Sequence, residues 1–258
     1  MKLKYEDLIS GDSIFIENVG HLRSPFLYEL KPTQGIGTWT YNLYIGLLAW
    51  DREKVINFLK MSTGRKLSKL EDNTKLEVFD ILTIIDSARE LLRNAMAFFM
   101  LENIVWDEDK RAFITQDNET NEDIGQIDRS NFEEVRDMML QLNYINLGDS
   151  AKPLKHSSDR ARELWEKAQE YLKKESEKNT KDKELNLGNI ISKLAIASHS
   201  YNLLNIYNLT VFQLYDQFFQ CGYLRGTELN ERAYTIHGGE KFNMKDWLKP
   251  IINFKEGE

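Results

Sequence analysis

The sequence has little of what marks a secreted, disulfide-stabilised or membrane-spanning protein. It contains one cysteine, Cys221, in 258 residues, which excludes an intrachain disulfide and a structural zinc site built on cysteines. Its first residues lack the apolar run of a signal peptide, and no stretch approaches the roughly 18 uncharged apolar residues of a membrane span. We therefore expect a cytoplasmic protein with no membrane partner.

Basic charge and turn-forming residues are also scarce. The 34 Lys and Arg are outnumbered by 41 Asp and Glu, which gives a net charge of −7. No surplus of cations is left for a phosphate-binding face, so we expect no nucleic-acid partner. Four prolines and fourteen glycines favour helices over a sandwich of many turns. We expect a mainly α fold with a small β-hairpin and short-strand part.

Sequence motifs for catalysis are absent. The chain has no HExxH, GxSxG, Walker, CxxC or GxGxxG motif, so we expect a protein that is not an enzyme, with no cofactor and no bound metal. His199 lies between Ser198 and Ser200, but polar residues where a helix meets a loop explain this cluster equally well. Catalytic triads are spatial rather than sequential, so an enzyme with a dispersed site near His199 or His237 stays open as an alternative.

The first 145 residues predict an N-terminal helical domain with short strands. Apolar residues recur every three or four positions from about 75 to 100, which predicts one central helix. The β-favouring runs at 13–19 and 26–30 predict short strands, and two more runs around an acidic turn predict a hairpin near 103–115. Residues 117–123 lack the glycine that a calcium loop needs at its sixth position, which favours a solvated loop.

A second helical unit is expected after a polar linker at 146–157. It covers 158–258 and begins with a charged helix at 158–179. The narrow apolar stripe of this helix fits two interpretations: a surface helix lying on its own domain, or an arm that docks on a partner. The residues of the stripe that would make such a contact are Leu164, Trp165 and Leu172.

The clearest helix start in the sequence lies at Thr210. Its hydroxyl can cap the helix, with Gln213 three residues later to complete a capping box. Phe212 and Phe219 lie off the main apolar face of this helix, which leaves them as candidate exposed contacts, and Cys221 is interpreted as a small buried apolar residue. The apolar face itself comprises Val211, Leu214, Tyr215, Phe218 and Tyr223.

Three stretches resemble proteins of tailed phages and prophages of low-GC Gram-positive hosts. They are Ala97–Trp106 with its following hairpin, Gly125–Val135 with Gln141–Ile145, and Tyr201–Phe218 with Asp246 and Trp247 downstream. Together they are similar to the small acidic cytoplasmic proteins called tail assembly chaperones, which are encoded near the tape-measure gene. The similarity lies in packing patterns over about half the chain, so no functional residue is transferred by motif.

This resemblance implies a non-enzymatic protein of the bacterial host cytoplasm. It would bind the helical tape-measure protein, keep it soluble and help to recruit tail-tube subunits, with Leu164, Trp165, Leu172, Phe212 and Phe219 as candidate contacts. A structural virion subunit of the baseplate or connector is the alternative, and an enzyme with a dispersed site is a third. The sequence leaves the oligomeric state open, a homo-oligomer included.

Overall fold

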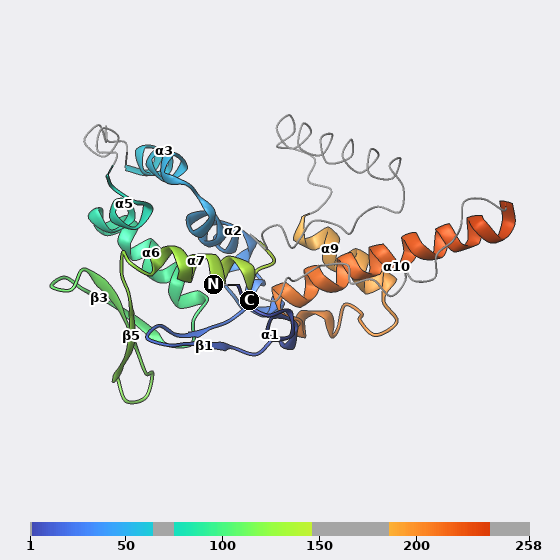
Figure 1. Cartoon of the computed structure of the whole chain (residues 1–258), viewed down its shortest axis with the longest axis horizontal. Helices are drawn as coiled ribbons and strands as arrows, with labels where there is room; N and C mark the ends of the chain where they lie inside the picture. Colours follow the sequence, from blue (N-terminus) through green and yellow to red (C-terminus); the bar gives the residue numbers. More distant parts are fainter. Residues whose placement is uncertain (1, 64–74, 146–185, 238–258) are drawn as a thin grey trace. The chain divides into compact units, whose positions relative to one another are not determined.

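The computed structural model describes residues 2–63, 75–145 and 186–237 (Figure 1). The chain divides into two units, Met1–Asn146 with Tyr207–Phe212, and Leu147–Ile206 with Gln213–Glu258. The expected linker at 146–157 and the expected charged helix at 158–179 lie outside the described residues, so both stay predictions.

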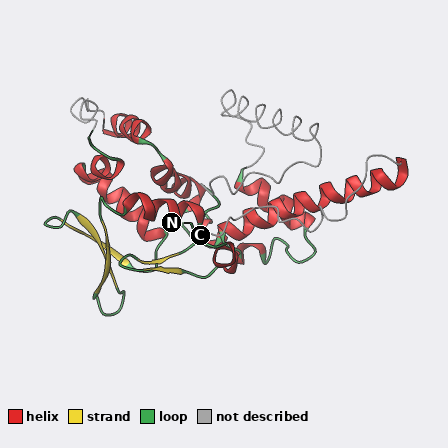
Figure 2. Cartoon of the chain, in the orientation of Figure 1, coloured by secondary structure: helices red, strands yellow, loops and turns green. Residues whose placement is uncertain are grey.

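The first unit mixes helices with two antiparallel sheets, so the expectation of a mainly α fold is wrong. Figure 2 shows the strands of the described residues in this unit alone. The strand content was underestimated because the strands are only three to five residues long. Strands of this length are too short to give a strong alternating pattern in the sequence. The strands are β1 (Ile14–Ile16), β2 (Gly20–Leu22), β3 (Asn103–Asp107), β4 (Ala112–Gln116) and β5 (Asp123–Ile127).

The hairpin predicted near 103–115 is confirmed as β3 and β4, which pair from Asn103 with Gln116 to Asp107 with Ala112. β5 extends this sheet on the other side of β4. At its outer edge the N–H of Gln126 donates to the carbonyl oxygen of Asn18 at 2.9 Å. The turn between β1 and β2 therefore covers an edge that would otherwise expose unpaired backbone groups.

The segment at 26–30 differs from the expected strand, because Leu27–Leu30 form the 3-10 helix η1. The Glu29 side chain explains the change: its carboxylate accepts the N–H of Phe26 at 2.7 Å and two hydrogen bonds from the Arg23 guanidinium, each 2.8 Å long. These bonds hold a turn that the alternating apolar residues alone did not reveal.

The central helix expected over 75–100 is broken into α5 (Val78–Ile84) and α6 (Asp86–Phe98). Ile85 separates them in extended conformation, at φ −103° and ψ 117°. Thr83, Ile84 and Ile85 form a β-branched run, which weakens helix propensity at this point. The apolar stripe continues through the break and reaches Leu92 and Met96, both fully buried.

The core of the first unit holds an aromatic cluster under the three-stranded sheet. The ring of Phe79 on α5 lies 5.2 Å from Phe132 and 6.1 Å from Phe113, measured between centroids. Trp106 packs edge-on against Phe113 at 4.8 Å. The other helices of this unit are α1 (Tyr5–Ser10), α2 (Gly37–Ala49), α3 (Arg52–Thr63) and α7 (Phe132–Gln141).

Residues Tyr207–Phe212 return to the first unit and pair with its N-terminal part. The N–H of Leu27 donates to Leu209, and the N–H of Val211 donates to Pro25, both at 2.9 Å. Phe212 is fully buried, and its ring lies 5.1 Å from Tyr144. The segment is thus part of the first core, although sixty residues of sequence separate it from the rest.

The described part of the second unit consists mainly of α9 (Leu187–Ala197) and α10 (Val211–His237), the latter beginning in the first unit. The Asn186 side chain caps α9 by accepting the N–H of Asn189 at 2.8 Å. α10 begins directly after Thr210, as the sequence predicted. The short 3-10 helix η3 (Ile206–Asn208) lies between them.

Candidate protein-binding surface

An apolar groove of about 500 Å³ runs between α9 and α10 within the second unit. Phe219 from α10 is 43% exposed at this groove, and Ile196 from α9 is 82% exposed. Figure 1 shows the two helices side by side over this stretch. The groove is lined by Lys193, Leu194, Ile196, Ala197, Phe218, Phe219, Cys221, Gly222, Tyr223 and Arg225.

The packing of α9 explains why Ile196 is exposed at the groove. Ile190, Ile191 and Leu194 form the buried stripe of this helix. Ile196 lies two positions beyond Leu194, which turns it away from that stripe by about half a helical turn. The aliphatic side chain of Ile196 is therefore in solvent and adds little hydrophobic stabilisation to the packing of the described residues.

A second hollow of about 430 Å³ shares Ile196 with the groove as a lining residue. Leu203 and Leu204 contribute to it and are 62% and 93% exposed. Leu204 is held out by a local turn in which its N–H donates to the Asn202 side chain at 2.8 Å. The second unit therefore presents several large apolar side chains near one another, as protein interaction sites do.

The contact residues predicted from the sequence lie in different environments in the structure. Phe219 lines the groove and is exposed, as expected. Phe212 was expected at the surface, and this is wrong, because it is fully buried against residues of the first unit. Leu164, Trp165 and Leu172 lie outside the described residues, so their role stays a prediction.

Several surface residues escaped the sequence interpretation. They are Ile196, Leu203 and Leu204. Ile196 lies off the buried stripe that made α9 predictable, and Leu203 and Leu204 lie in the segment after α9, which carries no helical periodicity. The signal that could have found Ile196 is its position: it is an aliphatic residue off the buried stripe, the same criterion that singled out Phe219. Cys221 and Phe218 were expected to be buried, and both are half-exposed at the groove.

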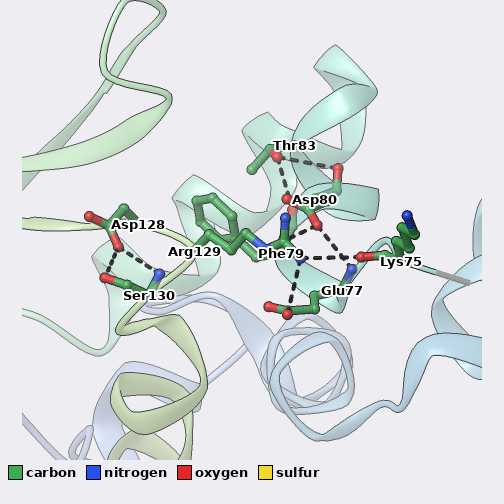
Figure 3. Close-up of polar contacts among 8 residues, drawn as sticks. All are labelled: Lys75, Glu77, Phe79, Asp80, Thr83, Asp128, Arg129 and Ser130. Atoms are coloured by element: carbon green, nitrogen blue, oxygen red, sulfur yellow. Dashed lines mark hydrogen bonds and ion pairs between the residues drawn. The ribbon is translucent and has the colours of Figure 1, made fainter.

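A polar cluster of the first unit connects the start of α5 to the loop between β5 and α7. Arg129, which lies between β5 and α7, reaches the start of α5 (Figure 3), where its guanidinium bonds Glu77 at 3.1 Å and approaches Asp80 at 3.4 Å. The hydrogen bond from Arg129 holds the pKa of Glu77 below its ordinary value. Asp80 in turn accepts the N–H of Glu77 at 3.0 Å. These side chains therefore hydrogen-bond one another and the backbone at the start of α5, which explains the cluster by its role in the fold.

Asp128 acts in a similar local way beside this cluster. Burial alone would raise the pKa of its carboxyl group, but hydrogen bonds donated by the hydroxyl and N–H of Ser130 lower it overall. These bonds close the turn that leads into α7 (Figure 3).

The histidine cluster suggested by the sequence has no catalytic geometry among the described residues. The Ser198 hydroxyl oxygen accepts the N–H groups of Ser200 and Tyr201, at 3.1 and 3.2 Å, and so closes a turn. His199 is exposed. Within the described ranges, no three His, Cys, Asp or Glu side chains gather as metal ligands would. None of the helices there combines the length and hydropathy that crossing a bilayer requires.

The comparisons with known proteins point to the class of phage-related proteins. The matching family model is described as the YomV second domain, and YomV is a Bacillus prophage-region protein. The match covers residues 177–252, a span that includes α9, α10 and the groove between them. No curated protein and no solved structure matches the chain.

Proposed function

We propose that this chain is a non-enzymatic phage tail-morphogenesis protein. In this role it binds the tape-measure protein, keeps it soluble during tail assembly in the cytoplasm of the bacterial host, and helps to recruit tail-tube subunits. The observation that carries the proposal is the apolar groove with Phe219 at its edge, within the segment that is similar to a prophage domain.

The physical demands of this role fit the described surface. A long helical protein that awaits assembly exposes apolar stripes, which aggregate unless a partner covers them. A groove between two helices accepts such a stripe by helix-in-groove binding. The exposed Phe219 and Ile196 supply apolar surface that a bound helix would remove from water.

The net charge of −7 also supports the role. A strongly acidic carrier repels other copies of itself and of its complexes, which opposes aggregation while the cargo is bound. The proposal therefore assigns the apolar groove to binding and the acidic remainder of the chain to solubility.

Co-expression with the tape-measure protein encoded near this gene tests the proposal. We expect the tape-measure protein to become soluble and to co-elute with this chain in size-exclusion chromatography. Phe219→Ala should weaken the complex, whereas Phe15→Ala, which removes an exposed phenylalanine of the first unit that is 56% accessible, should leave it intact. A tape-measure protein that stays insoluble, with no co-eluting complex, would contradict the proposal.

Mass spectrometry of purified phage particles separates this function from its alternative. A morphogenesis factor of this kind should be absent from the particle. A fixed copy number per virion would instead identify a structural subunit of the baseplate or connector, and would overturn the proposed function.

A further inference from the structure

The apolar surface of the groove continues along the exposed half of α10. Phe219, Gly222, Gly226 and Leu229 follow one another at spacings of three, four and three residues, which places them on one face of the helix. Leu229 is 65% exposed on this face. We call this set the α10 stripe; it begins in the groove and extends beyond the groove's last lining residue, Arg225.

The two glycines of the α10 stripe have no packing role in the described part of the chain. A Cβ atom added at Gly222 or at Gly226 would meet no atom within 4 Å. Each glycine inside a helix costs about 1 kcal/mol relative to alanine. Small residues at such positions allow the backbone of a second helix to approach closely, so a bound helix would account for both.

Charge around the α10 stripe is uneven. Lys193 and Arg225 line the groove where the stripe begins. Glu228 and Glu231 are exposed, but their positions at 100° per residue place them on the opposite side of α10 from the stripe. In an acidic chain, the binding face is therefore bordered by cations.

We propose that the groove and the α10 stripe bind one α-helix of another protein, with apolar residues at three-and-four spacing and Asp or Glu on the flank that faces Lys193 and Arg225. The inference rests on the proposed function of this surface and adds the chemistry of its partner. The glycines set how closely the two helices approach, the apolar residues supply the buried contact, and the two cations fix the orientation of the bound helix.

A second copy of this chain fits the same surface poorly. Pairing two α10 stripes would bring Arg225 of each copy to the border of the shared face, while Glu228 and Glu231 would face away from it. Like charges at the border of an interface oppose association. The charge pattern therefore favours an acidic-flanked helix of a different protein.

Binding of three synthetic helical peptides to the full-length chain tests the inference. All three peptides contain the same set of apolar residues. One carries glutamates on one flank of its stripe, one carries lysines there, and one has the first peptide's residues in scrambled order. In fluorescence anisotropy at low salt, we expect the glutamate peptide to bind at least about tenfold more tightly than the lysine peptide, with a gap that narrows as salt rises. The scrambled peptide should not bind.

Two variants separate binding from folding. The double substitution Lys193→Glu and Arg225→Glu should reverse the preference, so that the lysine peptide binds more tightly. Gly226→Leu should weaken binding of the glutamate peptide by about tenfold or more, because its side chain blocks close approach, while the melting temperature stays equal or rises. The matched control Leu224→Ala alters an exposed residue of α10 off the stripe and should leave peptide binding unchanged.

Several results would overturn the inference. They are equal binding of the glutamate and lysine peptides, an unchanged preference in the charge-reversed variant, full binding by the Gly226→Leu variant, or a dimer by light scattering that the same variant disrupts. If the tape-measure protein is solubilised but no peptide binds, the inference fails and the proposed function stands. If the glutamate peptide binds as expected but the tape-measure protein stays insoluble, the helix-binding surface stands and its proposed cargo is wrong.

Discussion

The Nδ1 atom of His21 lies 2.6 Å from the Oε1 atom of Glu102, and the same oxygen accepts the backbone N–H of His21 at 2.8 Å. The Glu102 side chain is only 4% exposed. The buried carboxylate of Glu102, the residue before β3, therefore binds β2 and accepts the backbone N–H of His21, which is distant in sequence.

Replacing Glu102 by alanine should destabilise the first unit. The substitution leaves the N–H of His21 without its acceptor, which costs about 1–3 kcal/mol. Glu102→Gln keeps an oxygen acceptor and should cost less. Urea unfolding followed by circular dichroism measures both, with Glu119→Ala in the exposed β4–β5 loop as control. Equal midpoints for the alanine variant and the control would contradict the assigned role.

Phe212 and Phe219 form a matched pair, because they share a helix and a side chain but differ in burial. Phe212→Ala should lower the free energy of unfolding by about 3–5 kcal/mol through the cavity it leaves. Phe219→Ala should change stability by about 1 kcal/mol or less, since its ring is partly exposed. Thermal unfolding compares the two, and a larger loss for Phe219 would show that the buried position has been misassigned.

The ion pair between Arg129 and Glu77 should make part of the stability depend on pH. The folded-state pKa of Glu77 is lowered by the hydrogen bond from Arg129. The contribution is therefore present above the unfolded pKa and is lost as the pH falls through the folded pKa. In Arg129→Ala the pKa of Glu77 should rise toward its ordinary value.

An NMR titration of the Glu77 carboxyl carbon measures this shift directly. Arg129→Lys, which keeps the charge but not the guanidinium geometry, should give an intermediate pKa. The difference in stability between the wild-type chain and Arg129→Ala should shrink in acid. A Glu77 pKa that is the same in both proteins would show that the pair does not persist in solution.

Gly125 tests how closely the β1–β2 turn approaches the sheet. A Cβ atom at this position would lie 2.2 Å from the carbonyl oxygen of Asn18, a backbone atom that cannot move aside alone. Gly125→Ala should destabilise the first unit by about 1–3 kcal/mol. Gly222→Ala, where the added methyl group meets open space, should stabilise α10 by about 1 kcal/mol. Denaturant midpoints that shift in the same direction for both would contradict this assignment.

The structural features that the sequence predicted correctly are those that depend on neighbouring residues. The β3–β4 hairpin and the start of α10 after Thr210 depend on residues within a few positions of one another, so periodicity and turn chemistry revealed them. The break at Ile85 was missed because the apolar stripe runs unchanged through it, while one residue adopts an extended conformation.

Burial that depends on distant partners could not be predicted in this way. Phe212 looked exposed because it lies off the apolar face of its own helix. The structure buries it through the N-terminal segment, where the Ser24 hydroxyl oxygen accepts its N–H at 3.2 Å. The groove was also hard to predict. Phe219 could be identified from the pattern of α10 alone, whereas Ile196 becomes part of a binding surface only because α9 packs beside α10.

The pairing of Leu209 and Val211 with Leu27 and Pro25 has a consequence for any cut in the chain. Proteolysis between residues 146 and 186 would break the covalent path, yet Tyr207–Phe212 would still be bound in the first core. The two fragments should therefore co-purify as a nicked complex and separate only in denaturant. A recombinant fragment that stops at residue 145 would lack Phe212 and would expose the apolar surface that this ring now fills.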